Sequence, residues 1–399
     1  MALKDVLRKV ETGWSPVCDS ARPAMDEWGV LKLSAVTSGK FVASEAKRLP
    51  SEVLPRIAFE VRPGDVLMSR ANGVKALVGV ACTVNRVRPR LLLPDLVFRL
   101  VADPDVLDPG FLGVVLTSAA VRRQIEAAMR GTSGQYKVSQ ADVRALEIPR
   151  LPLPEQRDVV AANEAFERRI GALERELGKL RTVENAVVAG AMTESGGRIE
   201  LGRWLSSIEA GKSPMAEDTP AGDGEWGVLK VSAVQPGWFK AIENKVVREA
   251  EFINARYRVR AGDLLMTRAN TEELVGLACV VRERAERLML SDKTLRLVPD
   301  TGVAEAEFIE LALLSPSVRS QVRSRATGTS ASMKNIGQSA VRQLMVPDVP
   351  KDVQRKVVAA VSASRKRSQG IQRQIAKLRQ VQRGVIEDLL SGRSRVNRT

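Results

Sequence analysis

The chain consists of one unit written twice, and this repeat constrains the fold more than any other feature. The run WGVLKLSAV at 28–36 returns as WGVLKVSAV at 226–234, and VRPGDVLMSRAN at 61–72 returns as VRAGDLLMTRAN at 259–270. The period is therefore about 198 residues, and two copies of one fold are expected. Between these anchors the copies diverge. The shared parts are therefore expected to form a scaffold and the divergent parts an adjustable surface.

Each copy is expected to end in one long helix, over 151–192 and 349–390. Both segments begin extended and proline-rich, since each proline disfavours α geometry in the preceding residue and admits a helix only behind it. Apolar residues then recur at steps of three and four, which is typical of a coiled-coil seam. The expected helix-pairing seam consists of Ile170, Leu173, Leu177, Leu180, Val183, Val187, Ile371, Ile375, Leu378, Val381, Val385 and Leu389.

The rest of each copy mixes strands with short helices. In the first copy, strands are expected at 30–33, 66–69, 77–84 and 96–101. A helix is expected over 109–129, capped by Asp108 and broken near Ser118, and a short helix is expected behind Ser139. If the copies pack by a two-fold operation, the long helices run antiparallel. Repeats stacked as beads, or helices paired between molecules, are the alternatives.

The predicted fold is therefore α/β (mixed α+β), with two globular domains separated by two long antiparallel coiled-coil helices and an internal two-fold pseudo-symmetry. The expected boundaries are 1–150 for the first domain, 151–197 for the first helix, 198–348 for the second domain, 349–392 for the second helix and 393–399 for a basic tail.

The charge balance favours a polyanionic partner. The net charge is +15 and the sequence pI is about 10.1. Residues 351–399 contain 13 Lys+Arg against 3 Asp+Glu, whereas 155–197 contain 6 against 8, so the two helices carry complementary charge. This favours pairing of the helices, with a solvated basic face as the alternative. Without an apolar run of spanning length, a cytoplasmic protein with no membrane partner is expected.

The residues of common catalytic sites are scarce. There is no histidine, which removes the usual general base and metal ligand. Of three cysteines, Cys82 and Cys279 lie in apolar runs and are interpreted as core thiols. Asp65 and Asp263 fit turn residues better than metal ligands, and Pro94-Asp95 and Pro299-Asp300 resemble a nuclease's paired acids only faintly. The sequence therefore predicts a chain without catalytic residues, metal or cofactor of its own.

Two repeated segments carry the side chains that DNA recognition requires. The first is SRANG at 69–73, answered by TRANT at 267–271, where an arginine and an asparagine flank a turn. Arg70 and Arg268 have the bidentate geometry for phosphate or guanine. Asn72 and Asn270 are candidates for a base contact, or alternatively for a left-handed turn position.

The second segment is the loop GTSGQYK at 131–137, answered by GTSASMK at 328–334. Lys137 and Lys334 are shared between the copies and are expected at phosphates, while the differing residues before them are expected to read bases. A helix C-cap with an exposed loop is the alternative. The candidates from this segment are Ser133, Gln135, Tyr136, Lys137, Ser330, Ser332, Lys334 and Asn335.

Several of these motifs resemble those of a known family. The run PGDVLMSRANG, the later GTSGQYK, and IPRLPLPEQRDVV leading into a long helix resemble the specificity subunits of type I restriction-modification systems. The resemblance covers nearly the whole chain and both copies. The second copy departs at 346–358, where Val353 replaces the glutamate found at Glu155.

The resemblance implies two target-recognition domains, each reading half of a bipartite DNA target, with the paired helices as a ruler. It implies double-stranded DNA, two methyltransferase subunits that bring S-adenosylmethionine, and motor-nuclease subunits in the full restriction complex as partners. It also implies phage defence as the role and an outer helix face, including Glu164, Glu167, Arg168 and Glu174, as the docking surface. A free-standing DNA-binding regulator, using the broken helix as a helix-turn-helix, and a coiled-coil scaffold without nucleic acid are the alternatives.

Overall fold

The computed structural model describes residues 1–131, 134–193, 197–283, 285–330 and 333–394 of the 399. The chain divides into two compact units, and each unit is built from both halves of the sequence. Unit 1 comprises Met1–Glu174 and Gln372–Thr399, and unit 2 comprises Arg175–Ile371. Residues 1–150 are called the first head below and residues 198–348 the second head. Each unit thus contains one head and part of each long helix.

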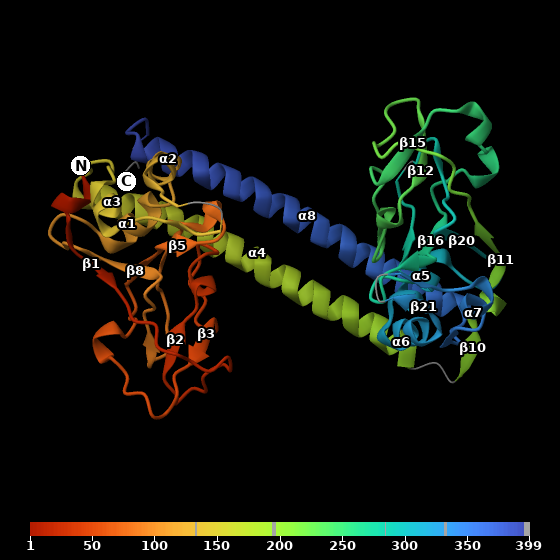
Figure 1. Ribbon diagram of the computed structural model, residues 1–399, viewed down its shortest axis with the longest axis horizontal. Coiled ribbons are helices and arrows are strands. Elements are labelled where there is room, and N and C mark those ends of the chain that lie inside the picture. Colours follow the sequence, from red (N-terminus) through yellow and green to blue (C-terminus); the bar gives the residue numbers. More distant parts are fainter. Residues whose placement is uncertain (132–133, 194–196, 284, 331–332, 395–399) are drawn as a thin grey trace. The chain divides into compact units, whose positions relative to one another are not determined.

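The first head is built on two small sheets and three short helices (Figure 1). One sheet has the order β1-β8-β4-β6 with antiparallel neighbours, and the other has the order β3-β2-β7, in which β2 and β7 are parallel. A short pair, β5-β9, lies outside both sheets. The elements are β1 (Leu7–Thr12), β2 (Gly29–Leu31), β3 (Ala46–Arg48), β4 (Val66–Ser69), β5 (Ala71–Asn72), β6 (Ala81–Thr83), β7 (Leu91–Leu92), β8 (Val97–Ala102), α1 (Pro109–Val115), α2 (Ala119–Ala128), β9 (Tyr136–Lys137) and α3 (Gln140–Ala145).

The second head repeats this arrangement. Its larger sheet has the order β11-β20-β16-β18, its smaller sheet β15-β12-β19, and its third sheet β17-β22-β21. Two strand pairs, β13-β14 and β10-β23, complete it. The elements are β10 (Arg198–Glu200), β11 (Leu205–Ala210), β12 (Trp226–Leu229), β13 (Val234–Gln235), β14 (Trp238–Phe239), β15 (Asn244–Val247), β16 (Leu264–Thr267), β17 (Ala269–Asn270), β18 (Ala278–Val280), β19 (Leu288–Met289), β20 (Thr294–Pro299), α5 (Ala306–Leu314), α6 (Pro316–Arg325), β21 (Thr327–Ser330), β22 (Met333–Asn335), α7 (Gln338–Arg342) and β23 (Met345–Pro347).

Several local expectations are confirmed. The Asp108 carboxylate accepts a hydrogen bond from the Phe111 amide at 3.1 Å and caps α1, and the helical segment breaks at Ser118, whose side chain caps α2. Ser139 and Asp142 form a reciprocal capping box at the start of α3. The strand expected at 77–84 is shorter, because Gly79 adopts a positive φ of 75° and the pairing begins only at Ala81.

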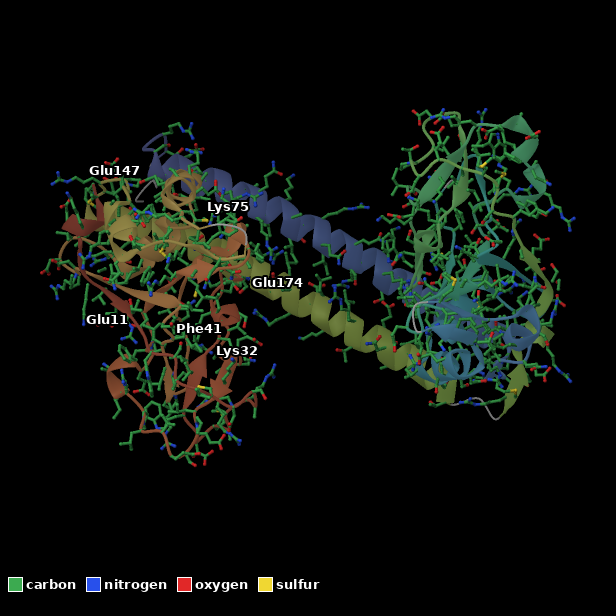
Figure 2. The ribbon with its side chains drawn as sticks, in the orientation of Figure 1. Glu11, Lys32, Phe41, Lys75, Glu147 and Glu174 are labelled. Atoms are coloured by element: carbon green, nitrogen blue, oxygen red, sulfur yellow. The ribbon has the colours of Figure 1, made fainter. Side chains whose placement is uncertain are left out.

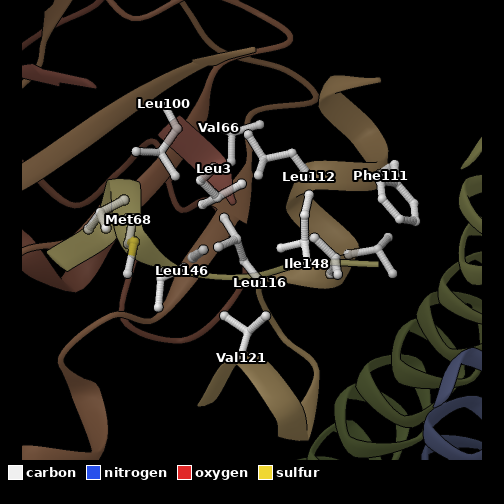
Figure 3. Close-up of a cluster of buried hydrophobic side chains, with 14 of the residues drawn as sticks. Leu3, Val66, Met68, Leu100, Phe111, Leu112, Leu116, Val121, Leu146 and Ile148 are labelled. Atoms are coloured by element: carbon white, nitrogen blue, oxygen red, sulfur yellow. The ribbon is translucent and has the colours of Figure 1, made fainter. Parts of the chain in front are cut away.

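The main core of unit 1 lies between the larger sheet and the short helices. Phe98, Phe111 and Leu112 are fully buried, and Figure 3 shows Leu112 and Phe111 among side chains from the strands and from the segment before α4. The same cluster includes Ile386 and Leu389 from the far end of the chain. The core of the first head is therefore completed by residues nearly 300 positions later in the sequence.

One long helix follows each head in sequence, α4 (Leu153–Thr193, 41 residues) after the first and α8 (Lys351–Leu390, 40 residues) after the second (Figure 1). In unit 1 the start of α4 lies beside the end of α8, since Gln382 Nε2 donates to Glu167 Oε1 at 2.9 Å. In unit 2 the end of α4 lies beside the start of α8, where Arg365 Nε donates to Glu184 Oε1 at 3.0 Å. Within each unit the helix segments therefore run antiparallel.

Glutamates of α4 and arginines of α8 pair in both units. Arg379 Nη2 lies 2.6 Å from Glu174 Oε1 in unit 1, and Arg367 Nη2 lies 2.5 Å from Glu176 Oε1 in unit 2. These contacts agree with the complementary charge of the two helix sequences. Because the side chains are substantially exposed, each pair is expected to contribute well under about 1 kcal/mol.

Most of the expected seam is buried or half-buried, but two of its positions are not. Ile170, Leu173 and Ile375 are at most 8% exposed, whereas Val183 is 57% exposed and Val381 43% exposed. A pair of helices has only one contact face, and these two valines lie outside it. They are 198 positions apart, so the same site is exposed in each copy.

One buried glutamine attaches each long helix to its own head. Gln156 is fully buried, and its Oε1 accepts from the Asp108 amide at 2.8 Å while its Nε2 donates to the carbonyls of Val106 and Leu151. Gln354 makes the equivalent three bonds to Glu305, Val303 and Val349 in unit 2. Both the donor and the acceptor groups of the amide are thus satisfied, which orients the first turn of each helix against its head.

The second head contacts α8 through a further buried charge. Glu310 is fully buried, its Oε2 accepts from the Val280 amide at 2.7 Å, and its carboxylate pairs with Arg282 and Arg365. The residue in the same place in the first head is Gly113, beside Thr83. In unit 1 Lys40 Nζ instead lies 3.4 Å from Glu174 (labelled in Figure 2) and 3.5 Å from Glu167, both on α4. The two heads therefore contact their helices through different ion pairs.

Both α4 and α8 are longer than a bilayer is thick, yet neither has a window apolar enough to span one, and no other helix in the described ranges qualifies.

Candidate nucleic-acid interface

The structure brings the two candidate segments of each head together in one short sheet. In the first head, β5 pairs with β9, so that Ala71 faces Lys137 and Asn72 faces Tyr136. In the second head, β17 pairs with β22, so that Ala269 faces Asn335 and Asn270 faces Lys334. Residues 71–72 and 136–137, more than 60 residues apart in the sequence, therefore lie side by side, and so do 269–270 and 334–335.

The arginine of each surface is anchored near its base. Arg70 is half-buried, with its guanidinium carbon 5.6 Å from the centroid of the Phe98 ring. Arg268 is exposed, and its Nη1 donates to the carbonyl of Asp292 at 3.5 Å. Neither side chain has an ion pair with a carboxylate among the described residues. Both guanidinium groups therefore retain donors for a ligand such as phosphate or guanine.

The two asparagines hold the turns by a different mechanism from the one expected. Asn72 Oδ1 accepts from the Val74 amide at 2.9 Å, and Asn270 Oδ1 accepts from the Thr271 amide at 2.8 Å. A left-handed backbone was expected as one alternative, and it is wrong, because Arg90 and Arg287 are the positive-φ residues other than glycine in the described part of the chain. Asn72 instead closes an Asx turn through its side-chain oxygen, whereas Asn270 bonds the amide of the next residue.

The shared lysines do not occupy equivalent positions. The Val138 amide donates to the carbonyl of Arg70, and the Ile336 amide donates to the carbonyl of Arg268, so Val138 and Ile336 correspond. Lys137 therefore corresponds to Asn335, and Lys334 corresponds to Tyr136. The second loop is one residue longer, which shifts its lysine one position along the strand; that both lysines lie at phosphates stays a prediction.

A glycine at the start of each second loop allows a backbone carbonyl further along the same loop to approach closely. Gly131 and Gly328 have φ values of 123° and 138°, and a Cβ there would lie 2.2 and 2.4 Å from the carbonyl oxygens of Gln135 and Met333. No other residue fits such a position without displacing backbone. The helix C-cap alternative is wrong in the first copy. There α2 ends at Ala128, and Gly131 instead makes room for the carbonyl of Gln135.

The other candidates differ in availability. Gln135, Lys137 and Asn335 are exposed, Tyr136 is half-buried against the main core of unit 1, and Lys334 Nζ donates to the carbonyl of Gly328 at 2.9 Å. Ser133 and Ser332 lie outside the described residues. Ser330 ends β21, and its side chain also lies outside the described part.

An arginine from the second short helix supports the first loop in both heads, and the sequence analysis missed it. Arg122 Nη1 donates to the carbonyl of Val78 at 2.6 Å and its Nη2 to the carbonyl of Lys75 at 3.2 Å. Arg319 makes the same two bonds, at 2.6 Å to Val275 and 2.9 Å to Glu273. Burial lowers the pKa of Arg319. The only available signal was the recurrence of this arginine behind the break in each helical segment.

The larger sheet of each head carries a buried arginine between two carboxylates. Arg99 contacts Glu11 and Asp65, and Arg296 contacts Glu209 and Asp263. Asp65 and Asp263 also accept from the backbone amides of Arg62 and Arg260, each three residues before the aspartate, which confirms their role as turn residues. Burial raises the pKa of both aspartates despite the nearby arginines. Across the described ranges, no three potential ligands gather as a metal site would require.

Comparison with known proteins identifies the chain's relatives. A segment of 164 residues, 41% of this chain, is 34% identical to the EcoEI type I restriction enzyme specificity subunit of Escherichia coli, and it spans 27% of that subunit's length. The EcoKI specificity subunit of E. coli strain K12 is 22% identical over 360 residues, covering 83% of this chain and 74% of that subunit. This chain is similar to type I restriction enzyme specificity subunits. No family model matches it.

Solved structures of type I S subunits show that this chain shares their fold. The S subunit of a type I restriction-modification system from M. genitalium superimposes with a TM-score of 0.58 over the whole of this chain and 96% of its own, at 13% identity. A type I restriction-modification structure described for complex assembly and conformational transition gives a TM-score of 0.55 over 98% and 96%, at 19% identity.

Proposed function

We propose that this protein is a non-catalytic DNA-specificity subunit of a restriction-modification system. Each head reads one half of a bipartite, gapped sequence in double-stranded DNA, and the long helices act as the ruler that sets the gap. The supporting observation is the duplicated surface. The β5-β9 and β17-β22 pairs have the same backbone bonds in both heads but display different side chains, as two readers of different half-sites require.

The chemistry of the surface fits this role. Arg70 and Arg268 directly precede the paired strands of the two heads. The amide, aromatic and ammonium groups of these strands differ between the heads. The net charge of +15 supplies the general attraction for phosphate, while differences at the sheet supply the choice of bases. Catalysis is assigned to partner methyltransferase subunits, which bring S-adenosylmethionine, and restriction to motor-nuclease subunits.

The methylated motif in genomic DNA of the source cell tests this proposal. The expected motif has two short half-sites separated by a gap of unspecified bases. Exchanging residues 28–149 for the matching segment of a related subunit is expected to change one half-site alone. A continuous motif, or a change in both half-sites, contradicts the assignment of one half-site to each head.

A salt titration separates this function from a scaffold without nucleic acid. Affinity for random duplex DNA is expected to fall steeply and linearly on a logarithmic salt scale. A flat salt dependence contradicts DNA binding. The helix-turn-helix alternative gains no support, because α1 is buried from Phe111 to Val115 and Arg122 of α2 is bound to the adjacent loop.

The docking surface for methyltransferase subunits is assigned to the exposed valines of the long helices. The glutamates considered for this role are in part engaged, since Glu167 and Glu174 bond to Gln382, Arg379 and Lys40. Val183 and Val381 are exposed at matching positions of the repeat, and two equal sites suit two copies of one partner.

Replacing each valine with aspartate tests this assignment. V183D and V381D are each expected to remove one methyltransferase subunit from the co-purified complex, and the double variant both. V17D is the matched control, because Val17 is 91% exposed in the first head. Full retention of both subunits by the double variant contradicts this docking surface.

A further inference from the structure

The two heads differ in length at two neighbouring loops, and the differences compensate. From Asn72 to Gly79 the first loop takes seven steps, but from Asn270 to Gly276 it takes six. From Gly131 to the residue paired with Arg70 the second loop takes seven steps, and its counterpart from Gly328 takes eight. Between these loops the offset between the copies stays at 197, as for Arg99 with Arg296 and Arg122 with Arg319. Length thus varies at the reading surface while the scaffold stays in register.

The two loops touch, so the first loop belongs to the same surface. A Cβ placed on Gly73 would lie 3.3 Å from the carbonyl oxygen of Gly134. The first loop directly continues β5 in one head and β17 in the other. In the first head residues 73–77 therefore adjoin the paired strands, and in the second head residues 271–274 follow β17 directly.

The supporting arginines fix which residues of the first loop correspond. Arg122 bonds the carbonyl of Lys75, and Arg319 bonds the carbonyl of Glu273. Lys75 and Glu273 therefore occupy equivalent backbone positions, and Glu272 is adjacent. Arg319 is 7% exposed, so its guanidinium group is committed to the loop and is not free for a ligand.

The charge at this position is reversed between the heads. Lys75 is exposed in the first head (Figure 2), whereas Glu272 and Glu273 are exposed in the second, with 77% of the Glu273 side chain accessible. The charge is also reversed at a neighbouring helix position, where Glu126 on α2 corresponds to Arg323 on α6. Arg323 Nη1 lies 3.4 Å from Glu273 Oε2. At such exposure this pair is weak and does not hold the carboxylate in place.

A carboxylate on a DNA-facing loop restricts what the loop can contact. It is repelled by phosphate, and guanine and thymine offer acceptor atoms in the major groove that it cannot use. The exocyclic amino groups of cytosine (N4) and adenine (N6) are donors that a carboxylate accepts well. We propose that Glu272 and Glu273 of the second head read an amino-bearing base edge in their half-site, and that Arg319 is the residue that positions their loop.

This inference rests on the proposed function and is tested with the full-length protein by selection from a duplex library randomised at both half-sites. The double variant E272Q/E273Q is expected to lose roughly 5- to 150-fold of its preference for cytosine or adenine at one or two positions of one half-site. The other half-site is expected to stay unchanged. K75Q is the matched control, and its effect is expected in that other half-site only.

The outcomes separate the two proposals. If the wild-type protein selects no sequence, the proposed function fails. If E272Q/E273Q binds all sequences more tightly by the same factor, the carboxylates act only through their charge and the reading role is overturned, while the proposed function stands. An unchanged preference overturns it in the same way.

The positioning role of Arg319 has its own test. R319M is expected to flatten base preference at the same positions as E272Q/E273Q, and R319K to restore part of it by bonding one of the two carbonyls. Since R319M also removes buried hydrogen bonds, the melting temperature is measured in parallel. Lower stability with an intact base preference in the folded protein overturns the positioning role.

Discussion

Replacing Gln354 with leucine is expected to destabilise unit 2 by about 3 kcal/mol. The glutamine is fully buried and bonds three backbone groups, the Glu305 amide at 3.0 Å and the carbonyls of Val303 and Val349 at 3.2 and 2.8 Å. Leucine is similar in volume, so little cavity is created, but all three groups lose this partner. Each loss costs about 1–3 kcal/mol, and the apolar gain of a buried leucine offsets part of the sum.

Urea denaturation followed by circular dichroism, together with thermal melting, measures this cost. For a unit of this size, about 3 kcal/mol corresponds to a melting temperature lower by roughly 6–12 °C. Q156L is expected to have the same effect on unit 1, because Gln156 makes the equivalent three bonds. Q369L, at an exposed position of α8, is the matched control and is expected to change stability by at most about 0.5 kcal/mol.

The reasoning is refuted if Q354L costs less than about 1 kcal/mol while Q369L costs nothing. That result would mean that water or a small shift of α8 satisfies the freed groups, and that the glutamine does not fix the helix to its head.

Three further outcomes are expected. E310A should destabilise unit 2 by about 3–5 kcal/mol, because it leaves Arg282 and Arg365 without their buried carboxylate. In the first head, G113A places a methyl group against Thr83 and tests steric fit alone. Equal stability of E310A and wild type in denaturant contradicts the role of this charge. Burial raises the pKa of the Cys82 and Cys279 thiols to about 12, so iodoacetamide at pH 8 should label only Cys18, and slowly, since its pKa is also raised; rapid labelling of three thiols in the folded protein counts against these buried environments. Inserting four residues, about one helical turn, after both Leu177 and Gln374 should lengthen the spacer in the methylated motif and leave its half-sites unchanged, and altered half-site bases would count against a separate ruler.

The elements with strong local signals could be predicted from sequence. Capping side chains and proline positions gave the break at Ser118 and the start of α3 behind Ser139, because these bonds reach only three residues along the chain. The long helices followed from the spacing of apolar residues. Where a contact is set by neighbours in sequence, the sequence carries its signal.

The site depended on contacts that no local pattern records. Shared letters made Lys137 and Lys334 look equivalent, but pairing with β5 and β17 sets the register, and one added residue shifts the second lysine. Arg122 and Arg319 look like ordinary helix-surface residues until the loops they support are folded beside them. Val183 and Val381 fit the heptad spacing equally well, yet a two-helix pair has room for only part of that pattern.

The way the chain is shared between the units also sets an order for its biosynthesis. Unit 2 is one continuous segment, 175–371, and can close as soon as that segment has left the ribosome. Unit 1 awaits Ile386, Leu389 and Leu390, which are made after the whole of unit 2 and which complete its hydrophobic cluster. Of the two heads, the one made first is thus the one completed last, and its exposed core surface needs protection by a chaperone until α8 has been made.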